Sequence, residues 1–411
     1  MNIRSFDPER DHKAVRRIWL ETGWIDHGND DDAKYLDIAL SHYNTLVADI
    51  NGEAECMVAT VPGRIQHLES ELSLSIVAAV TTSFIARKQG MASRLTAQAV
   101  ANDAANGADV AALGMFEQGY YSRLGFGTGP YEHKIVFDPS QLNIDVKAGI
   151  PQRLGTDDYR DVHSALINRW RGHGGVQITS AKFTHAEMGW VEKGFGLGYR
   201  NSKNQLTHFI WGESKDEHGP FKIKAIAYQN KEQLLELMAL LKNLGDQMYA
   251  VQLLEPCHLQ MQDLIDTPFR RQYTTQGSDF EEINNAEAFW QIRINNIFTC
   301  LEKTCLPDRP DLSFNLTLSD PISDFLPADS KWQGISGEYT IHLGEKCSAK
   351  AGHSDNLSLL HASVGGFSRL WLGCASATAI SMTGELDASQ DLLNKLQQSF
   401  SLPLPKTGWD F

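Results

Sequence analysis

The stretch "VTTSFIARKQGMASRL", residues 80–95, constrains the fold more than any other part of the sequence. It begins as an apolar run typical of a strand and continues, after a short turn at Gly90, as a run typical of a helix. A glycine in such a turn lets a ligand approach the backbone closely. The N–H groups at the helix start form an anion site, and Arg87 and Lys88 add positive charge. The stretch predicts a pyrophosphate site; the alternative is a plain helix start with a solvated basic turn.

Strand and helix signals alternate around this stretch over the first 140 or so residues. Two apolar runs flank Asn51-Gly52, which is a strong hairpin signal. A long strand is expected at 71–86, a helix at 91–106 closed by Gly107, and a last strand at 131–137 that ends the unit. This alternation predicts a mixed α/β sheet.

The pattern changes twice further along the chain, which predicts three domains, 1–145, 146–285 and 286–411. The second domain repeats an α/β-like pattern. The third is expected to be α+β, with a helix at 290–303 and one of its strands at 367–373. A chain of 411 residues is too long for one ordinary core, so several domains are expected in any case.

Bulk properties exclude several classes of protein. No apolar run approaches the ~20 residues of a membrane helix, and the N-terminus lacks a secretion signal, so we expect a cytoplasmic protein without a membrane partner. The net charge of -14 argues against a nucleic-acid partner and is compatible with a cationic substrate. The six cysteines form no CxxC pair, so we expect reduced thiols and no metal site.

A second motif follows the predicted strand at 108–114. In "GYYSRLGFG", Tyr121 stands four residues before Gly125-Phe126 on a predicted short helix. Strand, RxxGxA turn, helix, strand and YxRLGF, in this order and spacing, resemble the GNAT acyltransferases. The fold class expected from this resemblance is two tandem GNAT-like domains, the second degenerate, because residues 146–285 contain neither motif.

The GNAT resemblance implies acetyl-CoA as cosubstrate and no metal. Its pyrophosphate would lie on the amides around the Gly90 turn, and its pantetheine would pair with the preceding strand, where an N–H could polarise the thioester carbonyl. Matching the signature makes Tyr121 the acid that protonates the departing thiolate. The neighbouring Tyr120 is expected to pack in the core. The implied cofactor-binding residues are Val80, Thr81, Thr82, Arg87, Lys88, Gln89, Gly90, Met91 and Ala92.

The first domain offers no obvious base for the attacking amine, which is mostly protonated at neutral pH. Asp26, in an acidic run after the first helix, is either part of a cation-attracting entrance or a solvated loop residue. His133 lies in a strand-like run, where a structural role is expected.

The three-part layout resembles the Eis-type (enhanced intracellular survival) acetyltransferases over essentially the full chain. In that family the third domain resembles a sterol carrier protein and delivers an aromatic C-terminal residue whose carboxylate is the general base. The resemblance gives this role to Phe411, and places Trp24, Asp26 and Asp410 at the substrate pocket. It also implies a homo-oligomer, hexameric in several relatives. The pKa of a terminal carboxylate is ordinarily about 3.5, so burial among aromatic rings would have to raise it.

Some residues depart from the family's pattern, namely Thr82, Ser83, the Lys88-Gln89 pair and Ala92. None removes a catalytic group, but they leave the acceptor open. The leading hypothesis is an acetyl-CoA-dependent N-acetyltransferase acting on a primary amine of a cationic small molecule, aminoglycoside- or polyamine-like. The alternatives are a transferase for protein lysine or another acyl group, and a non-catalytic binding protein for lipids or small molecules.

Overall fold

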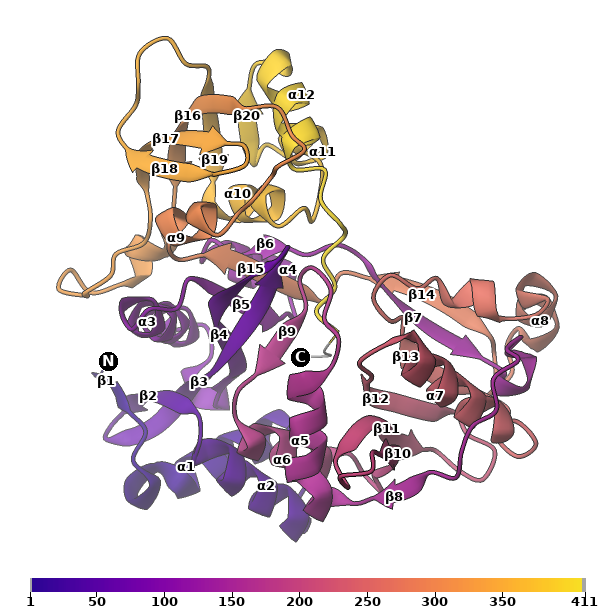
Figure 1. Cartoon of the computed structure of the whole chain (residues 1–411). Helices are drawn as coiled ribbons and strands as arrows, with labels where there is room; N and C mark the ends of the chain where they lie inside the picture. The colour runs from indigo at the N-terminus through magenta and orange to yellow at the C-terminus, as the bar shows by residue number, and fades with distance from the viewer. Residues whose placement is uncertain (1, 409–411) are drawn as a thin grey trace.

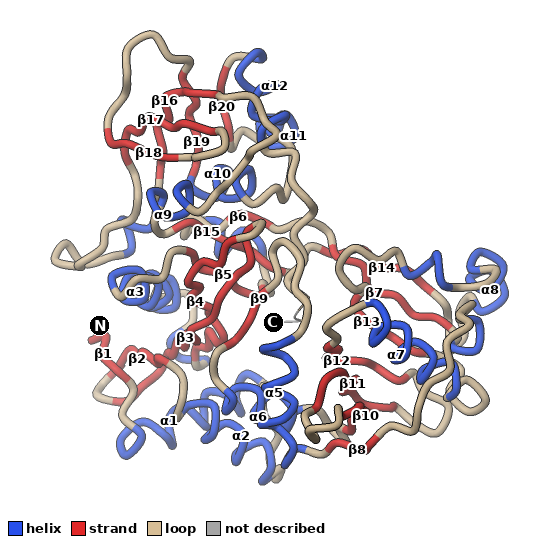
Figure 2. Tube along the Cα trace, viewed as in Figure 1, coloured by secondary structure: helices blue, strands red, loops and turns tan. Residues whose placement is uncertain are grey.

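The structure is a computed structural model and describes residues 2–408. Its strands form three sheets. Figure 1 shows them as three lobes, with the first sheet at the lower left, the second at the right and the third at the top. Figure 2 shows the helices lying against the faces of these sheets. No helix in the described part of the chain is long and apolar enough to cross a bilayer.

The first sheet has the strand order β1-β2-β3-β4-β5-β15-β6, and β9 pairs with β3. Asn51 and Gly52, both in the left-handed region (φ 53° and 89°), close the predicted β2–β3 hairpin. The strands are β1 (Asn2–Ser5), β2 (Asn44–Ile50), β3 (Glu53–His67), β4 (Ser70–Thr82), β5 (Val110–Gly114), β6 (Gly127–Thr128), β9 (Val176–Ile178) and β15 (Trp290–Ile294). The helices of this region are α1 (Pro8–Thr22), α2 (Asp30–Leu40), α3 (Met91–Ala105) and α4 (Gln118–Ser122), with the 3-10 turn η1 (Phe84–Ala86).

Strand β4 is bulged and then leaves its parallel neighbour. The β3–β4 register passes from Ala59↔Ala79 to Thr60↔Val77, so Ala78 is the extra residue. The β4–β5 pairing ends at Val77↔Leu113. Residues 78–82 therefore keep β3 on one side and open a gap towards β5 on the other.

The second sheet has the order β14-β7-β13-β12-β11-β10-β8. Its strands are β7 (Glu132–Phe137), β8 (Gln152–Leu154), β10 (Phe195–Arg200), β11 (Leu206–Ser214), β12 (Phe221–Ala227), β13 (Val251–Leu254) and β14 (Ile283–Glu287). The helices are α5 (Tyr159–Asn168), α6 (Ala181–Trp190), α7 (Lys231–Asn243) and α8 (Pro268–Thr275), with the 3-10 turns η2 (Pro139–Gln141), η3 (Thr156–Asp158) and η4 (Met261–Leu264).

The two sheets exchange one strand each. Strand β7 follows the first-sheet elements in sequence, yet it pairs with β13 and β14 of the second sheet. Strand β15 follows the second-sheet elements, yet it pairs with β5 and β6 of the first. Residues 131–137 therefore form the predicted strand but do not end the first sheet. The domain boundaries at 145 and 285 stay predictions.

The helix predicted over 290–303 is wrong in its first part. Residues 290–294 form β15, and the helix α9 (Ile297–Glu302) begins only after Asn296, whose side chain accepts a hydrogen bond from the Thr299 N–H. All five residues of β15 are buried. The strand fills the gap between β5 and β6, and this tertiary pairing overrides the helical spacing of its apolar residues.

The third sheet has the order β18-β17-β16-β19-β20. Its strands are β16 (Leu312–Ser319), β17 (Gly337–Leu343), β18 (Ser348–Ala351), β19 (Leu359–Ser363) and β20 (Leu386–Ala388), with α10 (Val364–Trp371), α11 (Ala377–Met382), α12 (Gln390–Ser399) and the 3-10 turn η5 (Pro321–Phe325). The strand predicted at 367–373 is wrong, because these residues belong mostly to α10. Phe367, Leu370 and Trp371 are spaced as on one helix face, and all are fully buried.

The third sheet is fused to the first by a continuous hydrophobic core. That core includes Trp290 and Ile292 of β15, Phe314 of β16 and Trp371 of α10. A fully buried ion pair lies at the same boundary, between Arg293 Nη2 and Asp320 Oδ2 at 2.6 Å. Because both partners are buried and paired, removing either would leave an uncompensated charge in the core.

The chain leaves α12 and runs down between the first and second sheets, as the yellow segment of Figure 1 shows. The Lys406 N–H donates to the His173 carbonyl (3.0 Å), and the Val176 N–H donates to the Thr407 carbonyl (2.9 Å). The last described residues are therefore held by backbone hydrogen bonds between the two sheets.

Candidate active site

A cavity of about 300 Å³ lies where β4 leaves β5. Its walls come from distant parts of the sequence: the bulged stretch of β4, the turn after β5, helix α4, helix α6 and the residue before β15. The lining includes Trp24, Val77, Ala78, Val80, Met115, Phe116, Tyr121, Phe183, Glu187 and Phe289. The splayed strands thus form a partly apolar pocket with a few polar groups, which is typical of a small-molecule site.

Tyr121 lies in the wall of this cavity and is 3% exposed. Its ring packs edge-on against Tyr120 at 4.8 Å and Phe116 at 5.6 Å. Burial raises the pKa of Tyr121 well above its ordinary value, with a further contribution from Tyr120. The phenol therefore stays protonated at neutral pH and can act as a hydrogen-bond or proton donor.

The short helix α4 is fixed at both ends. The Glu117 side chain caps it by accepting from the Gly119 and Tyr120 N–H groups. After the helix, Gly125 has φ 81°, and an added Cβ there would lie 2.9 Å from Arg293 Nη1. Arg293 donates to the Leu124 carbonyl, so the strand exchanged into the first sheet also holds the turn behind Tyr121. Tyr120 packs against the core cluster of the first sheet, as expected.

The Gly90 turn presents the uncapped start of α3 to solvent. Gly90 is the N-cap with φ 73°, and no side chain caps the helix. An added Cβ at Gly90 would meet nothing within 4 Å, so the backbone angle, and not space, favours glycine here. The first intrahelical bond runs from the Arg94 N–H to the Gly90 carbonyl, so the N–H groups before it remain available for an anion.

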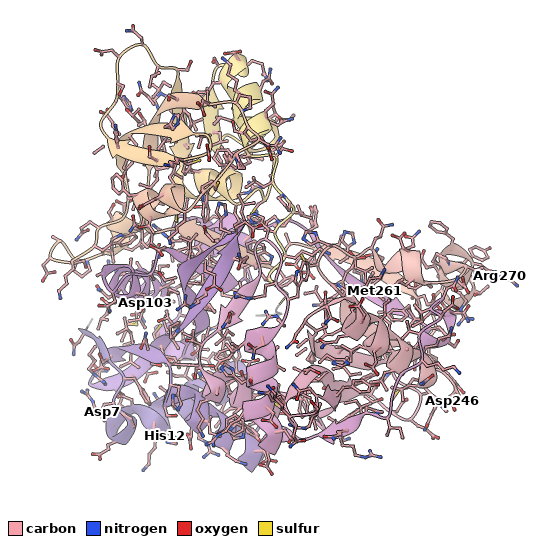
Figure 3. The ribbon with its side chains drawn as sticks, viewed as in Figure 1. Asp7, His12, Asp103, Asp246, Met261 and Arg270 are labelled. Carbon is pink, nitrogen blue, oxygen red and sulfur yellow. The ribbon has the colours of Figure 1, made fainter. Side chains whose placement is uncertain are left out.

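The basic side chains of this turn lie in the open. Residues 87–90 are exposed, whereas Met91 is buried and Ala92 half-buried. Arg87 lies over the Phe84 ring at 5.7 Å, and the Gln89 amide donates to the Ile85 carbonyl. At the other end of α3, Asp103, labelled in Figure 3, accepts from the Ser75 hydroxyl at 2.6 Å and so ties the helix to β4.

The predicted cofactor strand lies at the opening. Val80 lines the cavity, and Thr82 Oγ1 lies 3.3 Å from Cys56 Sγ. The Thr81 hydroxyl is buried without a hydrogen-bond partner in the described chain. Residues 78–82 do not pair with β5. Their backbone groups on that side are therefore open to hydrogen bonds from a bound molecule.

Of the predicted substrate residues, Trp24 lines the cavity and packs edge-on against Trp19 at 5.1 Å. Asp26 is exposed on the loop after α1 and does not line the cavity; its N–H donates to Asp32. Asp410 and Phe411 lie outside the described residues. His133 pairs with the Asn284 amide oxygen at 2.8 Å, which fits the structural role expected for it.

Two cavity residues that the sequence did not indicate come from α6. Phe183 and Glu187 reach the first sheet because β9 pairs with β3 and carries the following helix with it. The Glu187 carboxylate raises the pKa of the buried Tyr43, after the larger effect of burial itself. Ser180 is a recognisable helix N-cap, but nothing in the local sequence reveals that α6 lines the same cavity as Tyr121.

Glu132 links the last described residues to a neighbour of the cavity wall. The Thr407 N–H and hydroxyl donate to Glu132 Oε1, each at 3.3 Å, and Trp290 Nε1 donates to the same oxygen at 2.8 Å. The residue before Trp290 is Phe289, which lines the cavity. Burial raises the pKa of Glu132. Within residues 2–408, no three His, Cys, Asp or Glu side chains cluster as metal ligands would.

Comparison with known proteins identifies the type of domain at the start of the chain. Residues 3–129 match the family model of the acetyltransferase (GNAT) domain. The chain thus carries a GNAT-type acetyltransferase domain, and its enzyme class is N-acetyltransferase. No curated protein matches the sequence.

Solved structures resemble the chain over nearly its whole length. A conserved protein of Enterococcus faecalis V583, described as a probable N-acyltransferase, aligns with a TM-score of 0.78 and 15% identity, covering 97% of this chain and 96% of that one. Eis1 from Mycobacterium abscessus aligns with a TM-score of 0.77 and 14% identity, covering 100% of each chain. A GCN5-related N-acetyltransferase from Anabaena variabilis ATCC 29413 gives 0.76 and 14%, also covering 100% of each. At these identities the likeness shows the fold, which confirms the predicted fold class; the sterol-carrier likeness of residues 286–411 stays a prediction.

Proposed function

We propose that the protein transfers an acetyl group from acetyl-CoA to a primary amine of a cationic small molecule, by direct attack in a ternary complex. The observation that carries this proposal is the single cavity in which the bulged end of β4, Tyr121 and Trp24 meet. A GNAT domain requires a place for a thioester between splayed strands, an acid for its sulfur and a pocket for an amine. This cavity offers all three.

Acetyl-CoA would supply the activated acyl group, and the chain would hold it through two features. The uncapped start of α3, with Arg87 and Lys88, suits the pyrophosphate. The open edge of residues 78–82 suits the pantetheine amides, and an N–H at the bulge could stabilise the developing oxyanion. The amine attacks the thioester carbonyl, and the Tyr121 hydroxyl donates its proton to the departing sulfur.

We further propose that the terminal carboxylate of Phe411 accepts the proton of the attacking amine. The support is the anchoring of the chain up to Gly408. Lys406 and Thr407 are hydrogen-bonded to His173, Val176 and Glu132, and Glu132 also accepts from Trp290, the neighbour of the cavity residue Phe289. Three residues beyond Gly408 can span ~10 Å when extended.

The charge of the protein and of its cavity supports the proposed acceptor class. A cationic amine suits a protein of net charge -14 with Glu187 in the cavity wall and Asp26 on the adjoining loop. Aminoglycosides and polyamines present several primary amines of this kind. A lysine side chain on a protein is the competing acceptor.

The test is thiol release from acetyl-CoA with a panel of spermidine, an aminoglycoside and a lysine-containing peptide. We expect turnover with at least one of the two small cations and a lower kcat/KM with the peptide. Turnover with the peptide alone would replace the small-molecule acceptor by protein lysine. Binding of a lipid without turnover on any amine would favour a carrier protein.

The role of the chain end has its own test. A few residues appended after Phe411 should lower kcat by ~10²–10⁴-fold, the usual contribution of a general base, because the carboxylate is displaced. The same residues added before Met1 are the matched control and should leave kcat unchanged. Full activity of the C-terminally extended protein would remove Phe411 from the mechanism.

A further inference from the structure

A second cavity, of about 130 Å³, lies where β12 and β13 part in the second sheet. These two parallel strands pair only at Phe221↔Val251 and Lys222↔Gln252. The β11–β12 register then passes from Gly212↔Ile223 to Trp211↔Ala225, so Lys224 is an extra, bulged residue. The bulge and the splay repeat the geometry of the β4–β5 opening in a sheet that lacks both GNAT motifs.

The walls of this cavity carry a strong excess of positive charge. Among residues 2–408, one carboxylate, Glu255, lines it together with six cationic side chains: Lys134, Arg169, Arg171, Lys222, Lys224 and Lys406. In a protein of net charge -14, such a concentration of cations around one cavity requires an explanation. Charges of one sign in a partly enclosed cleft attract small ions of the other sign.

Lys134 lies over the Phe289 ring at 5.9 Å, and three of the other cations pair with described carboxylates. Arg171 pairs with Glu71, Lys224 with Glu213 at 3.6 Å, and Lys406 with Glu255 at 3.2 Å. These pairs leave Arg171 Nη1 buried without a hydrogen-bond acceptor in the described chain.

Arg169 and Lys222 form no ion pair with any residue in the range 2–408. Arg169 gives two of its N–H groups to the carbonyls of Leu166 and Val176, which fix the guanidinium in place. Burial lowers the pKa of Arg169 to about 10, so the side chain still carries its charge at neutral pH. A fixed, partly buried guanidinium without a counter-charge is stabilised by a bound anion.

The rest of the lining is apolar and aromatic. Ile223 and Leu253 come from the two splayed strands. The rings of Trp170 and Tyr228 also line the cavity and stack on each other, with 6.4 Å between their centroids. The backbone offers no phosphate cradle of the kind found at α3, because the Asn230 side chain caps α7 by accepting from the Gln233 N–H at 3.0 Å. A ligand here would be held by side chains.

We propose that this cavity binds a small organic anion, with a carboxylate or phosphate group against Arg169 and Lys222 and an apolar body against the aromatic wall. Lys406, Thr407 and Gly408 form one side of the cavity, so the ligand lies beside the last described residues of the chain. The site is separate from the Tyr121 cavity, and its occupancy can be measured without acetyl transfer.

The experiment is calorimetric titration of the full-length protein with phenyl phosphate and with benzoate, at ionic strength matched with sodium chloride. We expect saturable binding of at least one of them; the better ligand tells whether the site favours phosphate or carboxylate. Lys222→Gln should weaken that binding by at least ~10-fold, since it removes one charge-assisted contact. Lys222→Arg keeps the charge and should retain most of the affinity.

The matched control separates this site from the anion site at α3. Lys88→Gln neutralises a lysine at the Gly90 turn and should leave the affinity unchanged. Absence of saturable binding for both anions overturns the proposal. It is also overturned if Lys88→Gln abolishes the binding while Lys222→Gln, folded with an unchanged melting temperature, retains it.

Discussion

The first and second sheets are two versions of one arrangement. In each, a strand with one extra residue runs parallel to its neighbour for a few residues and then leaves it, at Ala78 in β4 and at Lys224 in β12. A strand taken from the other half of the chain lies on the far side, β15 beside β5 and β7 beside β13. By strand order alone, both sheets could hold a cosubstrate.

The helix that follows each bulged strand differs. Helix α3 starts at Gly90 with no side chain on its N–H groups, whereas α7 starts at Asn230, which caps it. Helix α4 with the buried Tyr121 follows β5, whereas the helix that follows β13, α8, carries Tyr273, which is exposed and does not line the second cavity. The two splayed sheets therefore share a cleft and differ in the capping of one helix and in one tyrosine, and under the proposed function these differences decide what each cleft binds.

The largest effect should come from removing the hydroxyl of Tyr121, which lines the first cleft. Tyr121→Phe should lower kcat by ~10²–10⁴-fold, the range for loss of a general acid, while acetyl-CoA binding remains. Steady-state thiol release and calorimetry measure the two quantities.

The matched control is Tyr120→Phe. The Tyr120 hydroxyl is buried without a hydrogen-bond partner in the described chain, so its loss should change neither stability nor kcat. Loss of activity in Tyr120→Phe with full activity in Tyr121→Phe would reverse the assignment.

The next largest effect should come from adding charge at the start of α3. Gly90→Asp and Gly90→Asn share the cost of φ 73° and differ in one negative charge. We expect the Asp variant to have a KM for acetyl-CoA ~10–100-fold above that of the Asn variant, because the carboxylate repels the pyrophosphate. Equal KM values for the two variants would show that the pyrophosphate binds elsewhere.

A third prediction concerns pH and the fusion of the first sheet to the third. His67, at the end of β3, is fully buried, stacks on Trp371 at 4.3 Å and pairs with the Thr304 hydroxyl at 3.0 Å. Burial lowers its pKa well below the ordinary 6.5, with a smaller contribution from His173. The unfolded chain binds this proton below pH 6.5 and the folded chain does not, so stability is complete above that pH and falls below it.

Urea unfolding at pH 7.5, 6.5 and 5.5 measures this effect. Between pH 6.5 and 5.5 the wild type should lose ~1 kcal/mol more than His67→Gln, which lacks the titrating group. Parallel pH profiles for the two proteins would contradict the prediction. The second sheet's buried His208 is a milder case, because Glu236 at 3.1 Å opposes the lowering of its pKa by burial.

The smallest effect should come from removing the side-chain cap of α7, so that this helix starts uncapped like α3. Asn230→Gly removes the cap at a cost of only a few tenths of a kcal/mol in the free energy of unfolding. We expect acetyl-CoA to bind with unchanged stoichiometry, since the second cleft also lacks a basic turn at this helix. A second bound equivalent would show that the cap alone closes that cleft to the cosubstrate.

The sequence predicted best what depends on neighbouring residues. The hairpin at Asn51-Gly52, the strand–turn–helix around Gly90 and the short helix with Tyr121 are all present, because turn and cap chemistry act over a few residues. The grouping of Val80, Tyr121 and Trp24 around one cavity agrees with the resemblance from which those residues were chosen.

Long-range pairing limited the rest. Trp290, Ile294, Ile297 and Leu301 have helical spacing, while Trp290, Ile292 and Ile294 alternate as in a strand. The strand is chosen over the helix because residues 290–294 pair with both β5 and β6. No local sequence pattern reveals that pairing. Glu187 was not predicted for the same reason, because its place in the cavity wall depends on the pairing of β9 with β3.

The exchanged strands also set an order of events during synthesis. When Gly114 leaves the ribosome, β5 has an open edge, and the strand that closes it ends at Ile294. At a synthesis rate of ~5–20 residues per second, β15 is made on the order of 10 s or more after β5. The same dependence means that a gene fragment covering only residues 3–129 would encode an unfinished sheet with an exposed edge at β5.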